Sequence, residues 1–251
     1  MVRVFSCLRW YMSSPQHVLG IDACPAGWAV CTLDHWGGVS FAVVEHTRDL
    51  AGLIEGCDAT CVDIPIGIPD AAPRVCDARA KLILGRYNAR VFMTPPREVL
   101  GQPDYPSANA ESRRVLGKGL SKQAWNILPK VLAVDVLLQE RRDLRGRVFE
   151  CHPEIALWGL GSAVVTANKA TPEGRDARLG LLGRFVNAPE RCLENARMTI
   201  PARHAKDDDL IDAMVCTVAA AGVWDDTLRP LDPAEPRDAT GLAMNIWYRS
   251  P

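Results

Sequence analysis

The first third of the chain alternates short apolar runs with turn residues, and this pattern predicts β-strands. The strand-like runs cover residues 17–24, 27–34, 39–45 and 59–64. Gly37-Gly38 between the second and third runs predicts a hairpin turn. Residues 48–56 carry an apolar helical face that stops at Gly56, so a short helix is expected before the last of these strands.

The remainder of the chain has mainly helical periodicity, interrupted by one further strand. Predicted helices cover residues 71–85, 108–117, 121–138, 176–185 and 207–222, and a fifth strand covers 147–151. The helix at 121–138 has the clearest apolar stripe, and Pro129 inside it predicts a bend or a break.

Three hairpin-linked strands followed by a helix that crosses to a parallel strand form the ribonuclease H-like topology. We therefore predict an α/β fold with a ribonuclease H-like mixed five-stranded sheet, in which three strands are antiparallel and the others parallel. A helical insertion at about 70–145 and C-terminal helices complete it. We expect a single domain over 17–251, preceded by an N-terminal extension at 1–16.

Composition places the chain among soluble globular proteins, with 48% hydrophobic and 24% charged residues in a length of 251. No apolar run is long enough to span a bilayer, and 1–16 lacks the apolar core of a signal peptide. The nine cysteines include no C-x-x-C pair, which argues against a zinc site and for scattered thiols in a reducing compartment. We expect a cytoplasmic protein without a membrane partner.

Charge is divided unevenly along the chain, although the net charge is only −1. Residues 71–149 hold 15 lysines and arginines against seven acidic residues, and the rest of the chain holds 14 against 23. A basic segment beside an acidic body suits an anionic partner, such as nucleic acid or another phosphate-containing anion. A solvated helical face rich in arginine is the alternative.

Carboxylates occupy two strand ends and one helix start. Asp22 lies near the end of the first strand and Asp63 at the end of the fourth, so parallel neighbouring strands bring them to one sheet edge. Asp209 and Asp212 are three residues apart and share a face of the last helix. Four such carboxylates suit Mg²⁺ or Mn²⁺ and a two-metal mechanism. The alternative for Asp207 and Asp208 is that they only cap the helix, which does not explain Asp212 deeper in it. The alternatives for the strand residues are that Asp22 hydrogen-bonds the turn after it and that Asp63 caps the loop before Pro65.

Several blocks of sequence resemble those of the DUF429 family of predicted ribonuclease H-like nucleases. The blocks are Gly20-Ile21-Asp22-Ala23-Cys24-Pro25-Ala26-Gly27-Trp28, Val62-Asp63-Ile64-Pro65-Ile66-Gly67, Arg74-Val75-Cys76-Asp77-Ala78-Arg79, Thr94-Pro95-Pro96-Arg97, Gly119-Leu120-Ser121-Lys122-Gln123-Ala124-Trp125-Asn126-Ile127, Glu150-Cys151-His152-Pro153-Glu154 and Asp208-Asp209-Leu210-Ile211-Asp212-Ala213. The resemblance implies that Asp22, Asp63, Asp209 and Asp212 are metal ligands of a nuclease. Glu150 stands on the next strand and either assists the catalytic site or pairs with Arg147 or Lys169.

The middle blocks supply groups suited to phosphate oxygens and bases. The expected substrate-binding residues are Arg74, Arg79, Thr94, Arg97, Ser121, Lys122 and Gln123. Ser121 is equally suited to cap its helix. His152 has two possible roles. It is a general acid or base, or it is a packed structural residue, and the neighbouring Pro153 favours the second role.

These features predict a Mg²⁺- or Mn²⁺-dependent nuclease or phosphodiesterase. One alternative is a nucleotide-dependent phosphotransferase or ATPase of the actin-like and sugar-kinase superfamily. The turn Ala23-Cys24-Pro25-Ala26-Gly27 argues against it, because that turn lacks the Gly and Ser/Thr residues that cradle phosphate. A non-catalytic binding protein of the same fold is the other alternative.

Overall fold

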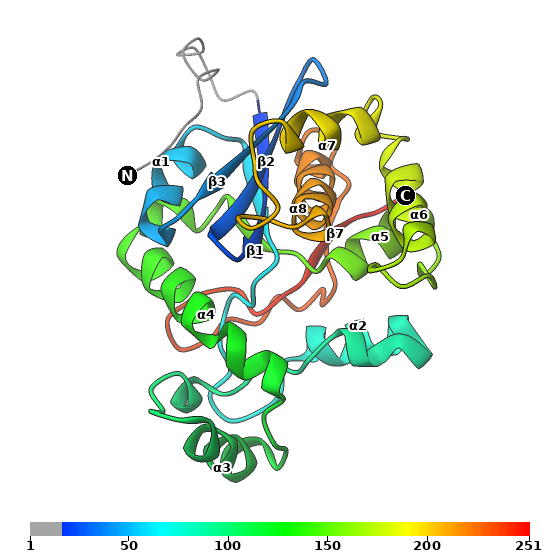
Figure 1. Ribbon diagram of the computed structural model, residues 1–251. Helices are drawn as coiled ribbons and strands as arrows, with labels where there is room; N and C mark the ends of the chain where they lie inside the picture. The colour runs from blue at the N-terminus through cyan, green and yellow to red at the C-terminus, as the bar shows by residue number, and fades with distance from the viewer. Residues whose placement is uncertain (1–16) are drawn as a thin grey trace.

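A mixed five-stranded sheet lies at the centre of the computed structural model, which describes residues 17–251. Its strands are β1 (His17–Cys24), β2 (Gly27–Asp34), β3 (Val39–Val44), β4 (Ala59–Val62) and β5 (Val148–Glu150). Their order is β3-β2-β1-β4-β5, with β1, β2 and β3 antiparallel, β4 parallel to β1 and β5 parallel to β4 (Figure 1). The α/β fold and mixed sheet predicted from the sequence are thereby confirmed.

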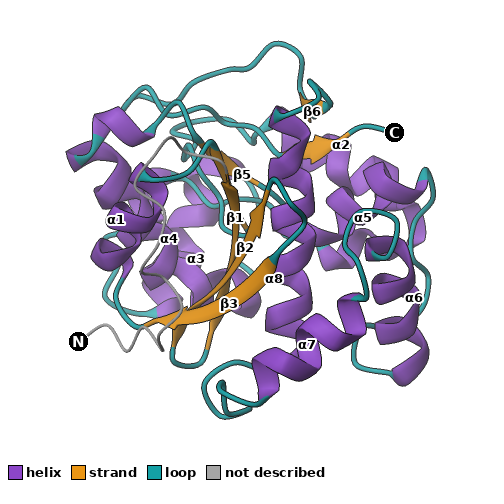
Figure 2. Ribbon diagram, turned by 90° about the horizontal axis from the view of Figure 1, so that it is seen from above, coloured by secondary structure: helices purple, strands orange, loops and turns teal. Residues whose placement is uncertain are grey.

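Helices cover both faces of this sheet (Figure 2). One face packs against α1 (Leu50–Glu55) and α4 (Lys122–Glu140). The other packs against α5 (Pro153–Gly161), α6 (Pro172–Leu182), α7 (Pro189–Arg197) and α8 (Asp207–Ala220). Strand alternation explains the two layers, because Leu19 and Ile21 point to the first face and Val18 to the second.

The segment between β4 and β5 extends beyond the sheet at the bottom of Figure 1. It contains α2 (Val75–Leu84), α3 (Tyr105–Leu116) and α4. Short 3₁₀ turns occur at Thr47–Asp49, Gly85–Arg90, Arg97–Val99, Arg142–Leu144 and Ala221–Val223. After α8, β6 (Leu228–Pro230) and β7 (Trp247–Arg249) form a separate two-stranded sheet.

Element boundaries differ from the predicted ones at a few places. The fourth strand ends at Val62, so Asp63 stands in the bend after it. Helix α4 runs through Pro129 as one helix to Glu140, and no break occurs there. Helices α5 and α7 and strands β6 and β7 were not predicted. The N-terminal extension at 1–16 lies outside the described residues, and within 17–251 no helix has the length and apolar character to cross a membrane.

Candidate metal centre

Three carboxylates from distant parts of the chain meet at one edge of the sheet. Asp22, Asp63 and Asp212 each present one oxygen, and these oxygens lie within 4.8 Å of one another. Asp22 and Asp212 are buried, while Asp63 is half-buried and open to a neighbouring cavity. Among the described residues no histidine or cysteine belongs to this group, so its donors are all hard oxygens.

Strand pairing explains why Asp22 and Asp63 are neighbours. Ile21 on β1 is paired with Val62, the last residue of the parallel strand β4, and each of the two is followed in the sequence by an aspartate. The backbone N–H of Asp63 donates to the carbonyl of Ile21 at 2.8 Å and continues this register by one residue. The register therefore fixes both carboxylates at the carboxyl ends of two parallel strands.

The third aspartate, Asp212, lies on α8, which packs very close to β1. A Cβ on Gly20 would be 2.0 Å from the carbonyl oxygen of Ala213 and 2.2 Å from the backbone nitrogen of Thr217. The hydroxyl of Thr217 also donates to the carbonyl of Cys31 on β2. Glycine at position 20 therefore allows α8 to approach β1 closely enough for Asp212 to reach Asp22.

Burial and mutual repulsion make these carboxylates costly to ionise together. The pKa of Asp22 is raised well above its ordinary value by burial first, and then by the charges of Asp63 and Asp212. Burial and the charge of Asp212 raise the pKa of Asp63, and burial raises the pKa of Asp212. A cation in this position would remove the repulsion between them.

Lys169, in the loop between α5 and α6, supplies one positive charge at this site. Its Nζ donates to Asp212 Oδ2 at 2.8 Å and lies 3.6 Å from Asp208 Oδ2. Its side chain remains 46% exposed. The sequence suggested Lys169 only as a partner for Glu150, and no motif around it signals contact with Asp212.

The family of the chain follows from its sequence. The family described as "Protein of unknown function (DUF429)" matches residues 20–236. The chain belongs to the DUF429 family. No curated protein and no solved structure matches it. Because the description of the DUF429 family assigns no activity, the chemistry of this member has to be argued from its own residues.

Asp209, the fourth ligand expected from the sequence, does not belong to the group of three. Its Oδ2 accepts the backbone N–H of Lys206 at 2.7 Å, as part of a capping box at the start of α8. Its charge still contributes to raising the pKa of Asp22. Asp209 therefore caps α8 close to the three carboxylates without joining them.

Glu150 is held by Arg74, and neither Arg147 nor Lys169 is its partner. Arg74 donates two hydrogen bonds to its carboxylate, at 2.7 and 2.6 Å, and the backbone N–H of Ile66 donates a third. Burial raises the pKa of Glu150 to about 7, while Arg74 acts in the opposite direction. Glu150 is thus committed to this buried ion pair and stands apart from the three aspartates.

Two of the arginines predicted to bind substrate are used inside the protein. The guanidinium of Arg74 is 1% exposed and donates to Asp77, Glu150 and two backbone carbonyls, so no N–H remains for a phosphate. Arg97 forms ion pairs with Asp135 at 2.8 Å and Asp238 at 2.6 Å. The prediction that Arg74 binds substrate is wrong, because a buried arginine that ties loops together has the same sequence signal as a surface one.

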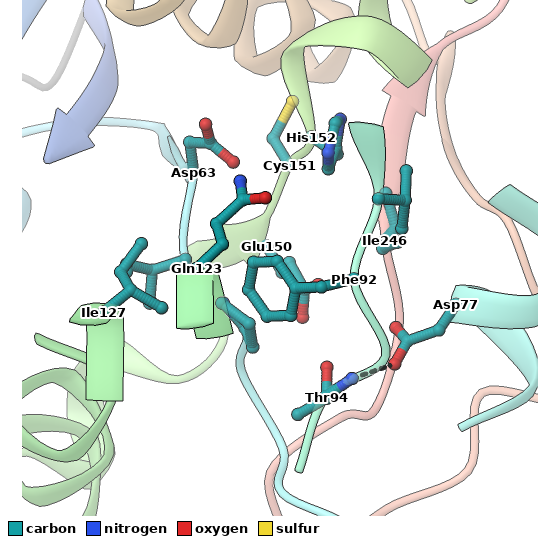
Figure 3. A pocket seen from close by; sticks show the side chains of 13 residues that line it. Asp63, Asp77, Phe92, Thr94, Gln123, Ile127, Glu150, Cys151, His152 and Ile246 are labelled. Atoms are coloured by element: carbon teal, nitrogen blue, oxygen red, sulfur yellow. Dashed lines mark hydrogen bonds between the residues drawn. The ribbon is translucent and has the colours of Figure 1, made fainter. Parts of the chain in front are cut away.

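The other predicted substrate residues have different positions. Ser121 accepts the backbone N–H of Ala124 and caps α4. Lys122 lies over the ring of Tyr105, and Arg79 is half-exposed and 3.6 Å from Asp232. Thr94 and Gln123 instead line a cavity of ≈ 90 Å³ that opens beside Asp63 (Figure 3).

His152 also lines this cavity, but both of its ring nitrogens are engaged. Nδ1 accepts the backbone N–H of Glu154 at 3.2 Å and so caps α5, which leaves Nε2–H to donate to the carbonyl of Arg90 at 3.3 Å. Burial lowers its pKa, which favours the neutral ring. His152 is therefore a packed structural residue, which is the alternative that the neighbouring Pro153 favours.

Proposed function

We propose that this DUF429 member is a divalent-metal-dependent phosphodiesterase that acts on nucleic acid or a related phosphate-containing anion. The observation that carries the proposal is the convergence of Asp22, Asp63 and Asp212 from three separate elements. The three carboxylates repel one another in a buried place, and a hard cation with oxygen ligands suits them. Mg²⁺ and Mn²⁺ fit this donor set better than Zn²⁺ does.

A bound divalent ion would polarise a phosphoryl oxygen and lower the pKa of an attacking water. The protein contributes the three ligand carboxylates, and it places Lys169 beside Asp212, where its half-exposed side chain can reach a phosphate held at the site. Two metal ions were expected from the sequence on the basis of four carboxylates. With Asp209 engaged in capping, the site instead offers three carboxylates with one lysine beside them.

The turn after β1 argues against a phosphotransferase or ATPase. The backbone N–H of Ala23, at the end of β1 just before this turn, donates to Asp22 Oδ1 at 2.7 Å, and that of Ala26 in the turn donates to the carbonyl of His204. Two donors that could hold a phosphate at this turn are therefore already used. The turn thus favours a site in which the phosphate is bound through a metal.

Mn²⁺ titration by calorimetry, combined with hydrolysis of an activated phosphodiester and of labelled oligonucleotides, tests the proposal. Wild-type protein is expected to bind Mn²⁺ and to hydrolyse at least one substrate, and Asp22→Asn, Asp63→Asn and Asp212→Asn are expected to lose both properties. Asp70→Asn, an exposed carboxylate also located after β4, serves as the matched control and is expected to retain both. Absence of Mn²⁺ binding by the folded wild-type protein would overturn the assignment.

A further inference from the structure

The cavity beside Asp63 is built from segments that are far apart in the chain. Its walls come from the bend after β4, the 91–94 segment, the first turns of α4, the end of β5 and Ile246 (Figure 3). Its volume is ≈ 90 Å³, and Asp63 belongs both to its wall and to the three-carboxylate group. A ligand in this cavity would therefore be adjacent to a phosphate at the proposed metal site.

The walls of the cavity are mostly apolar. Phe92 presents a half-buried ring, and Ile127 and Ile246 add aliphatic surface. The ring of Phe92 also packs against the apolar cluster around Leu120 and Leu128, which holds it in place. An aromatic wall in a narrow cavity favours a flat ring that can stack on it.

Only some polar groups in the cavity are available to a ligand. Both oxygens of Asp77 accept hydrogen bonds, and the polar atoms of Glu150 and His152 are also engaged. The side chains of Gln123 and Thr94, in contrast, make no hydrogen bond of their own within residues 17–251. In Figure 3 the Gln123 amide points towards Asp63, at the end of the cavity next to the proposed metal site.

We propose that this cavity is a subsite for one unpaired nucleobase, with Phe92 as the stacking surface and Gln123 as the hydrogen-bonding group. A nucleobase combines a flat ring with polar edges, which matches an aromatic wall with a free amide and a free hydroxyl. The cavity accommodates one ring system and has no room for a base pair, so a duplex would have to expose a base to enter it. This inference rests on the proposed function, since the phosphate attached to that base would lie at the three aspartates.

Nucleoside binding in the presence of EDTA tests the subsite separately from the metal site. The four ribonucleosides, with ribose as the uncharged control, are titrated against the full chain by saturation-transfer NMR. At least one nucleoside is expected to bind and ribose is not. Phe92→Leu is expected to weaken binding by about tenfold, as loss of one stacked base contact does in single-strand binding proteins. Gln123→Ala is expected to weaken it by about tenfold through loss of a hydrogen bond to the base. Asn126→Ala, an exposed amide on α4 outside the cavity, is the matched control and should change it less than twofold.

A second comparison identifies where the nucleobase comes from. We compare the binding of three ligands in Ca²⁺: a ten-nucleotide single strand, its blunt duplex and a nucleoside 5′-monophosphate. Tighter binding of either the single strand or the monophosphate than of the duplex supports the subsite. The proposal is overturned if neither the single strand nor the monophosphate binds more tightly than the duplex. It is also overturned if Phe92→Leu has no effect on any ligand in a protein with unchanged melting temperature. Mn²⁺ titration of Phe92→Leu separates the two proposals, because this variant loses nucleoside binding if the subsite is right and binds Mn²⁺ only if the metal site is right.

Discussion

At the scale of single residues, the three aspartates form a site that is unfavourable for the protein without a cation. The pKa of Asp22 is raised by burial and by its acidic neighbours. A carboxyl group with a folded-state pKa above its unfolded value binds protons more readily in the folded protein. Its contribution to the free energy of unfolding therefore falls as the pH rises above about 3.9, the unfolded value.

Asp22→Asn is accordingly expected to stabilise the metal-free protein while it abolishes Mn²⁺ binding. The amide keeps the oxygen that accepts the Ala23 N–H but carries no charge. We expect a melting temperature about 2–4 °C higher at pH 8, the shift that ~1 kcal/mol gives in a chain of this size, and a smaller difference at pH 5. Calorimetry in EDTA measures it, with Asp70→Asn as the control. A variant less stable than wild type at both pH values would contradict the repulsion argued here.

Lys169 is the second residue whose charge decides the properties of the site. Because its ammonium is 2.8 Å from Asp212 Oδ2, it would compete with a bound metal ion for that carboxylate. Lys169→Met is expected to raise Mn²⁺ affinity by about tenfold, equivalent to ~1.4 kcal/mol, and to lower the hydrolysis rate. Calorimetric titration and initial rates test this, with Lys206→Met at the exposed start of α8 as the control. Unchanged affinity and unchanged rate would exclude a role for Lys169.

Residue types and positions in the sequence predicted part of this site. Asp22, Asp63 and Asp212 were identifiable because each is a carboxylate inside or directly after an apolar element. The role of Arg74 could not be identified from the sequence, because its partner Glu150 lies 76 residues away along the chain. No local sequence feature distinguishes a buried guanidinium from an exposed one. Lys169 lies in a loop whose position depends on how α5 and α6 pack.

At the scale of elements, the contact between β1 and α8 holds the site together. Gly20 is the residue that permits it, since a methyl group there would collide with the backbone at Ala213 and Thr217. The backbone of α8 cannot yield as a flexible side chain would, so the helix itself would have to move.

Gly20→Ala is therefore expected to destabilise the protein by about 3 kcal/mol or more and to weaken Mn²⁺ binding through displacement of Asp212. Urea unfolding and calorimetric titration measure the two effects. Gly52→Ala is the matched control, since nothing lies within 4 Å of its Cβ in α1, and it should stabilise by about 0.5–1 kcal/mol. Equal stability of Gly20→Ala and wild type would show that α8 can pack against the sheet without a glycine at position 20.

Prediction of elements succeeded where an apolar run is long or is bounded by turn residues. Strands β1 and β2 have eight residues each, and α8 has fourteen. Helix α5 has only nine residues, seven of them buried, so it shows no polar face that would mark a helix. Strands β6 and β7 have three residues each, too few to be recognised from the sequence.

At the scale of the whole molecule, a buried ion network connects the segment after β4 to the sheet. Arg74 lies just before α2 and joins Asp77 of that helix to Glu150 at the end of β5. Burial alone would lower the pKa of Arg74, but these two carboxylates hold it above its ordinary value. Several positive charges of the basic segment are paired in the same way, so the count of basic residues overstates the charge available to an anion.

Removal of this arginine should therefore affect the whole fold. Arg74→Met leaves two buried carboxylates without their cationic partner, and we expect a loss of about 3–5 kcal/mol in the free energy of unfolding. Arg79→Met, five residues away and half-exposed, should change it by less than about 0.5 kcal/mol. Urea denaturation of both variants tests this. Similar stability of the two would show that Glu150 and Asp77 are satisfied by other groups.

The distribution of the three aspartates along the chain also has a consequence for synthesis. Asp22 and Asp63 leave the ribosome early, whereas Asp212 follows only after α2 to α7 have been made. A nascent chain that ends before α8 can pair β1 with β4 but holds only two of the three carboxylates. Uptake of a metal ion would then be a late event in biogenesis, and binding of that ion would report that α8 has been made and has packed against the sheet.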